Sequence, residues 1–160
     1  MIKIRKINKV NTGIELQLMN LQLECLPEDE PMLPGTDRKC CELRKIGEPC
    51  YDCPDLSWWW MGYSNKKPVC FSSMKQSSQW CDTVYLSRSG VLPKWRGRGL
   101  QKKMIGIREK LAKKLGYNWI VTDTTDNIPS SNSLISKNYK MFEPSNPWAH
   151  KESIYWRKKI

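Results

Sequence analysis

The sequence lacks any apolar run long enough to cross a membrane, which takes about 18 or more consecutive apolar residues. It also lacks the charged-then-apolar start of a secretory leader and any internal repeat. We therefore expect a soluble, cytoplasmic protein. A chain of 160 residues can bury one core holding roughly two thirds of its unfolded surface, so we predict a single domain over residues 1–160.

Acidic residues are scarce relative to basic ones. The chain has 16 Asp and Glu against 27 Lys and Arg, which gives a formal net charge of +11 at pH 7. Such an excess favours a polyanionic ligand, an acidic surface or a nucleic acid as the partner. Charge alone does not choose among these three.

Histidine occurs once, at His150, whereas cysteine occurs seven times. An odd number of cysteines favours free thiols in a reducing compartment over a disulfide framework. Cys50 and Cys53 have the spacing of a zinc knuckle, with Cys40 and Cys41 nearby. Because Cys40 and Cys41 are adjacent, both thiolates are poorly placed to reach one tetrahedral ion. We expect no metal and keep structural zinc as the alternative.

The pattern of apolar residues predicts an α+β protein. Strands are expected over 2–8, 57–63, 68–74, 82–92, 118–124, 139–143 and 153–157, and helices over 12–25, 100–115 and 130–137. Thr12 and Glu15 have the spacing of a capping box, so the first helix should begin there. Residues 27–56 contain five prolines and little periodicity, which predicts a long irregular loop. The order of elements predicts a mostly antiparallel sheet wrapped by helices.

The most regular helix follows a basic turn that contains Gly97 and Gly99. Its apolar residues fall on one helical face: Leu100, Met104, Ile107, Leu111 and Leu115. Glycine lets the backbone bend tightly, and the free amides and dipole of a helix start attract an anion. Cations surround the same turn: Arg96, Arg98, Lys102 and Lys103. The turn therefore suits a pyrophosphate, with a solvated basic turn as the alternative.

The segment 91–101 resembles the acyl-CoA-binding motif of the GNAT superfamily of N-acetyltransferases, a hydrophobic strand end followed by Arg/Gln-x-x-Gly-x-Gly/Ala. The matching residues are Arg96, Gly97, Arg98, Gly99, Leu100 and Gln101. Gln101 stands where the family has a small residue. A second block, residues 127–135 followed by Asn138 and Tyr139, has the order and spacing of the family. The resemblance covers roughly residues 58 to 160.

The resemblance implies a GNAT-type fold of six to seven strands and three or four helices, whose central strands splay apart around acetyl-CoA. The cofactor-binding residues it implies are Val91, Arg96, Gly97, Arg98, Gly99, Leu100, Gln101, Asn127, Ser130 and Asn132. It also implies that the loop 27–56 helps to form the acceptor side. The reaction would be direct attack of a neutral primary amine, of unknown identity, on the thioester, in a monomer or a dimer.

Such an attack needs a base for the amine and a proton donor for the thiolate. On the family mapping, Asp123 is the best placed carboxylate. The tyrosine of the family falls on Leu134, which leaves Tyr139 as the candidate donor. Two alternatives remain open. One is a CoA-binding domain without catalysis, because Gln101 and Leu134 depart from the family pattern.

The other alternative is a nucleic-acid-binding module that uses the tryptophans and the basic residues of the long helix. These residues are Lys102, Lys103, Arg108, Lys110, Lys113 and Lys114. A solvated helix face explains them equally well, and no groove-reading signature accompanies them. Any binding to nucleic acid should therefore be weak and independent of base sequence.

Overall fold

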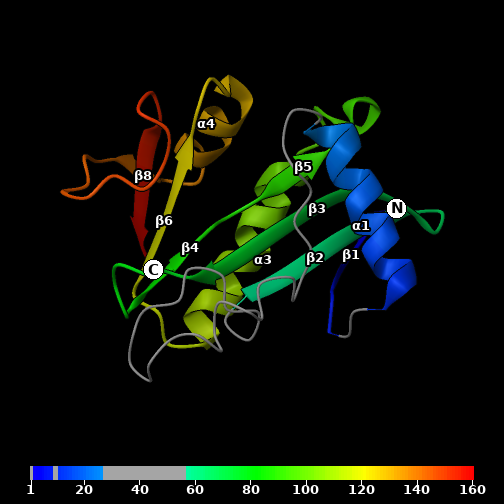
Figure 1. Ribbon diagram of the computed structural model, residues 1–160, viewed down its shortest axis with the longest axis horizontal. Coiled ribbons are helices and arrows are strands. Elements are labelled where there is room, and N and C mark those ends of the chain that lie inside the picture. Colours follow the sequence, from blue (N-terminus) through cyan, green and yellow to red (C-terminus); the bar gives the residue numbers. More distant parts are fainter. Residues whose placement is uncertain (1, 9–10, 27–56) are drawn as a thin grey trace.

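The computed structural model describes residues 2–8, 11–26 and 57–160 (Figure 1). Its elements in chain order are β1 (Lys3–Lys6), α1 (Thr12–Cys25), β2 (Ser57–Ser64), β3 (Lys67–Gln76), β4 (Thr83–Tyr85), β5 (Ser89–Val91), the 3₁₀ turn η2 (Pro93–Trp95), α3 (Leu100–Lys114), β6 (Trp119–Thr124), α4 (Ile128–Ile135), β7 (Lys140–Met141) and β8 (Ile154–Lys159). The proposed acceptor loop 27–56 and the group Cys40, Cys41, Cys50 and Cys53 lie outside the described residues.

One sheet of eight strands organises the described chain, in the order β1-β2-β3-β4-β6-β8-β7, with β5 pairing β3 off this path. Among the described strands, only β4 and β6 pair in parallel, and the other pairs are antiparallel. The prediction of a mostly antiparallel α+β fold is therefore confirmed. The strand count exceeds the expected range because the strand predicted over 82–92 is divided into β4 and β5.

A β-bulge causes this division. Lys75 pairs with Tyr85 and Ser72 with Ser89, so three steps along β3 face four steps along the other strand. One extra residue bends a strand away from its neighbour. Beyond the bulge, β5 runs toward α1 while β6 runs toward α4 (Figure 1). The predicted splay of the central strands is present.

The two faces of the sheet are covered by different helices. Along β2, Trp59 and Met61 join the core cluster of α1, whereas Trp60 joins that of Ile105 and Ala112 in α3. Side chains alternate along a strand, so α1 and α3 cover opposite faces. In Figure 1, α1 crosses in front of the sheet and α3 runs behind it.

Three local predictions need correction. The N-cap of α1 is Asn11, not Thr12: its Oδ1 accepts a hydrogen bond from the Ile14 amide at 2.9 Å, because a short polar side chain in extended backbone caps a helix well. Helix α4 begins at Ile128, earlier than expected, because Asn127 caps it and proline is tolerated in a first turn. The strand expected over 139–143 shortens to β7.

The buried face of α3 is also rotated from the predicted stripe. The residues buried in this helix are Leu100, Met104, Ile105, Arg108 and Ala112. Leu115, predicted to belong to the stripe, is 45% exposed. Arg108 is 2% exposed and therefore does not belong to the outer basic face. In the part of the chain that the structure describes, no helix is long and apolar enough to cross a membrane.

Candidate functional site

The turn before α3 has the backbone conformation that its glycines predict. Gly97 has φ of 74° and Gly99 has φ of 71°, in the left-handed region that side chains with a Cβ rarely adopt. A Cβ built at either position would meet nothing within 4 Å. The glycines therefore face open space, where a ligand has direct access to the backbone.

The start of α3 differs from the starts of the two other helices. Asn11 caps α1 and Asn127 caps α4 through their side chains, whereas no side chain of the described residues caps α3, whose N-cap is Gly99. The first backbone hydrogen bond into the helix joins the Lys103 amide to the Gly99 carbonyl at 3.0 Å. The amides before Lys103 are thus available to an anion.

A groove of about 650 Å³ opens at this turn, between β5, the start of α3 and the start of α4. It brings together eight of the ten predicted cofactor-binding residues: Val91, Arg96, Gly97, Gly99, Leu100, Gln101, Asn127 and Ser130. Arg98 and Asn132 do not line it. The Arg98 guanidinium lies over the Trp95 ring, 4.7 Å from its centroid, and Asn132 is exposed on α4.

Other lining residues were not predicted. Cys25 and Leu26 come from the end of α1, and Ser133 comes from the second turn of α4. Burial raises the pKa of the Cys25 thiol to about 11, although the Arg96 charge opposes this shift. No sequence signal could have found Cys25 or Leu26, because tertiary packing of α1 on β5 brings them to the groove.

Gln101 reaches across the groove wall. Its Nε2 donates to the Ser89 hydroxyl at 2.9 Å, so the side chain that replaces a small residue of the motif ties α3 to β5. Asn127 uses its side-chain oxygen to accept the Ser130 amide at 3.0 Å. Arg96 donates through Nε to the Val91 carbonyl at 3.2 Å. These bonds hold three sides of the groove in place.

Asp123 lies on β6 within an aromatic cluster. Its Oδ1 accepts hydrogen bonds from the Tyr85 hydroxyl at 2.8 Å and the Trp148 Nε1 at 2.9 Å. The Trp148 ring also packs edge-on against Trp80 and Tyr155, at centroid distances of 5.8 and 4.6 Å. Burial and the Asp123 charge raise the pKa of Tyr85. Sequence reasoning missed Trp148, which lies in a stretch without periodicity.

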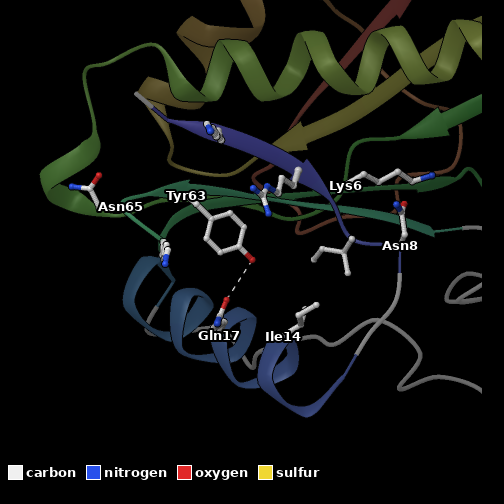
Figure 2. Close-up of a pocket in the computed structure, with 10 residues that line it drawn as sticks. Lys6, Asn8, Ile14, Gln17, Tyr63 and Asn65 are labelled. Atoms are coloured by element: carbon white, nitrogen blue, oxygen red, sulfur yellow. Dashed lines mark hydrogen bonds between the residues drawn. The ribbon is translucent and has the colours of Figure 1, made fainter.

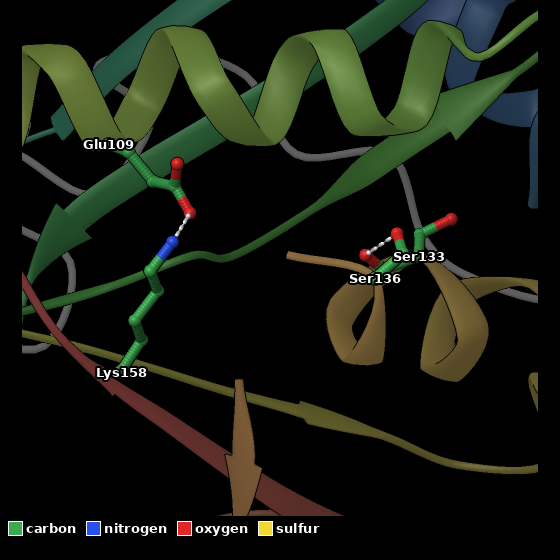
Figure 3. Close-up of polar contacts among 4 residues, drawn as sticks. All are labelled: Glu109, Ser133, Ser136 and Lys158. Atoms are coloured by element: carbon green, nitrogen blue, oxygen red, sulfur yellow. Dashed lines mark hydrogen bonds and ion pairs between the residues drawn. The ribbon is translucent and has the colours of Figure 1, made fainter. Parts of the chain in front are cut away.

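Tyr139 lies elsewhere. It is 3% exposed and belongs to the core cluster under α3, and it does not line the groove. Burial, together with the negative charge of Glu109, raises the pKa of its phenol. Lys158 lies over its ring and forms an ion pair with Glu109 at 2.9 Å (Figure 3). The Ser133–Ser136 hydrogen bond in the same view belongs to the end of α4.

A larger groove of about 750 Å³ lies between β1 and α1 (Figure 2). Tyr63 stands between these two elements, and its hydroxyl lies 3.3 Å from Gln17 Oε1. The cations that line this groove are Lys3, Arg5, Lys6 and Lys66. It contains neither a glycine turn nor any predicted site residue, so size alone does not identify the candidate site.

No protein-family model matches the sequence, and no curated protein matches it. Solved structures do. A protein described as a GNAT-family acetyltransferase from Desulfovibrio desulfuricans is 10% identical, with 99% of each chain covered and a TM-score of 0.72.

Two further structures were solved with coenzyme A bound. The PaiA N-acetyltransferase of Thermoplasma acidophilum is 13% identical, with 100% of this chain and 99% of that chain covered and a TM-score of 0.67. An acetyltransferase of Bacillus subtilis is 12% identical, with the same coverage and a TM-score of 0.66. Likeness at these identities concerns the fold, and by that measure this chain has the fold of the GNAT superfamily of acetyltransferases.

Proposed function

We propose that the protein is an N-acetyltransferase that moves the acetyl group of acetyl-CoA to a primary amine. The observation that carries this proposal is the groove at the start of α3, where an uncapped helix start and two left-handed glycines meet β5 and the start of α4. Coenzyme A bound to two structures of the same fold supports the choice of ligand. Arg96 and Lys102 supply positive charge beside the helix start.

In this proposal, each wall of the groove binds a different part of acetyl-CoA. The amides of the turn and of the first residues of α3 would bind the pyrophosphate. The backbone of β5 would run beside the pantetheine arm, and Asn127 and Ser130 would bond the arm from the α4 side. Arg98 and Asn132 stay proposed as outer contacts, because neither lines the groove in the described structure.

The reaction exchanges one bond for another. The amine nitrogen attacks the thioester carbonyl carbon, the carbon–sulfur bond breaks, the amine loses a proton and the CoA thiolate gains one. We favour Asp123 as the group that takes the amine proton, because both of its hydrogen bonds fall on Oδ1 and, within the described residues, Oδ2 is left for an acceptor. The buried position of Tyr139 does not favour it as the proton donor.

The test is thiol release from acetyl-CoA with a panel of primary amines. For the best acceptor, Asp123→Asn should lower kcat by ~10² to 10⁴, the contribution of a general acid or base, and leave the Kd of CoA unchanged. Asp126→Asn is the matched control, since Asp126 is exposed and its φ of 46° suits asparagine. CoA binding without turnover of any amine would favour the non-catalytic alternative, and absence of CoA binding would refute the proposal.

A further inference from the structure

Arg108 has the largest fully buried side chain of the described residues, and that side chain carries a charge. It comes from the middle of α3 and faces the sheet. Burying a charge is costly unless a charge of opposite sign compensates it, and burial accordingly lowers the pKa of Arg108 to about 10. Within the described structure Arg108 makes no ion pair; the pair nearest to it in sequence joins Glu109 to Lys158.

The hydrogen bonds of Arg108 go to backbone carbonyls instead. Its Nε donates to Met104 O, one turn back in α3, at 3.3 Å, and its NH1 donates to Ser73 O in β3 at 2.9 Å. The second bond is the informative one, because it joins a helix to a strand through the core. A methionine at this position would fill similar space without the cost of burying a charge. Core packing alone therefore does not explain an arginine.

Ser73 occupies a special place in the sheet. It lies opposite the bulge, and its amide donates to Arg88 O at 2.7 Å. Its hydroxyl lies 2.6 Å from the Ser87 hydroxyl and 3.2 Å from Arg88 O. With Arg108 on its carbonyl, Ser73 thus uses its amide, hydroxyl and carbonyl at the bulge. Arg108 in α3 thus bonds the residue that holds the strand at the bulge.

The segment held in this way is the point where the central strands part. The last links between the strands involve Leu86, whose amide donates to Val121 O at 2.9 Å and whose carbonyl accepts from Thr122 Oγ1 at 2.8 Å. Directly after the bulge, β5 lines the groove. If the pyrophosphate lies at the start of α3 and the arm follows β5, the thioester end reaches residues 86–88.

We propose that Arg108 is a positioning residue, which acts through Ser73 to fix the backbone of residues 86–88 where the thioester is received. The inference rests on the proposed acetyltransferase function. Arg108 itself does not line the cofactor groove. Its effect should therefore appear in turnover and in the order of the bulge, and not in the affinity for CoA, whose phosphates are held at the other end of the groove.

The experiment compares Arg108→Met with Lys110→Met, which removes a cation from the exposed face of the same helix. At a temperature where both are folded, Arg108→Met should lower kcat at least tenfold, with the Kd of CoA within threefold of wild type. Amide hydrogen exchange in the segment 83–91 should rise at least tenfold. Lys110→Met should change neither quantity. Arg108→Lys, which keeps a donor and the charge, should restore part of kcat.

Ser73→Ala provides a second route if Arg108→Met does not fold. It keeps the Ser73 carbonyl for Arg108 but removes the hydroxyl contacts with residues 87 and 88, so kcat should again fall at least tenfold at unchanged Kd. If the wild-type protein is active, unchanged kcat in folded Arg108→Met would overturn the role of Arg108. Unchanged kcat in Ser73→Ala would overturn the step by which the Ser73 hydroxyl positions residues 87 and 88. A loss of kcat that only follows the unfolded fraction would do the same. Wild-type protein that turns over no amine would overturn the proposed function and this inference together.

Discussion

Placing a side chain at Gly99 should separate the stability of the fold from its affinity for CoA. Gly99→Val adds a β-branched side chain at φ of 71°. Left-handed backbone costs roughly 1–2 kcal/mol for a residue with a Cβ, so the free protein should lose about that much stability. The added Cβ meets no atom within 4 Å, so no steric clash adds to this cost.

The stability of the protein with acetyl-CoA bound should fall by more than that of the free protein. At 100 times its Kd, acetyl-CoA stabilises a fold by about 2.7 kcal/mol, which for a chain of this size raises the melting temperature by roughly 5 to 11 °C. In Gly99→Val, the new side chain would occupy the space where we propose that a phosphate meets the backbone. If the Kd rises 100-fold, the same ligand concentration contributes only about 0.4 kcal/mol.

Gly116 supplies the control. It follows the other end of α3, its φ is 86°, and a Cβ there also meets nothing within 4 Å. Gly116→Val should therefore lose similar stability but keep the full ligand shift. Thermal melts of the three proteins, with and without acetyl-CoA, measure both quantities. An undiminished shift in folded Gly99→Val would refute the placement of the phosphates at this turn, and Gly99→Ala with Gly116→Ala repeats the comparison at lower strain.

Two further predictions concern stability. Lys158→Met leaves the half-buried Glu109 without its partner at 2.9 Å. The free energy of unfolding, measured in urea, should fall by about 1–3 kcal/mol, a value between those of exposed and of buried ion pairs. No change would show that the pair contributes nothing to stability. Burial raises the pKa of Cys25 and Cys70 to about 11, so their contribution to stability is complete below the unfolded pKa of about 8.5 and is lost as pH rises toward 11. The melting temperature should fall over that range. A small alkylating reagent at pH 8 should label exposed Cys81 faster than buried Cys25 and Cys70; equal labelling rates of these three thiols would contradict the assigned burial.

The elements that the sequence predicted well are those with a local physical cause. Two closely spaced glycines required a turn that only glycine adopts easily, and both have left-handed backbone. The helix after them has the length that its apolar spacing indicated. Side chains alternate between the two faces of a strand, and the consecutive residues Trp59 and Trp60 of β2 pack into clusters on opposite faces of the sheet.

The features that the sequence did not predict depend on contacts between distant segments. The bulge follows from the register of two strands against β3, which no local pattern encodes. Arg108 looked like part of a basic helix face because Lys110, Lys113 and Lys114 follow it in the sequence. Its partner Ser73 lies 35 residues earlier. The contact of Asp123 with Trp148 spans 25 residues and a loop without periodicity.

The two strands that part from each other, β5 and β6, are each held by hydrogen bonds to another strand. On one side, β5 pairs with β3 from Ser89 to Val91, and Gly90 allows the close approach of Cys25 from α1. On the other side, β6 pairs with β8 along its whole length. Both strands therefore stay paired where the central strands part. The edge of β5 that faces the groove has no strand partner among the described residues, so it is open to an extended ligand arm. For the proposed cofactor arm along this edge we therefore expect no cost in affinity for breaking hydrogen bonds of the sheet.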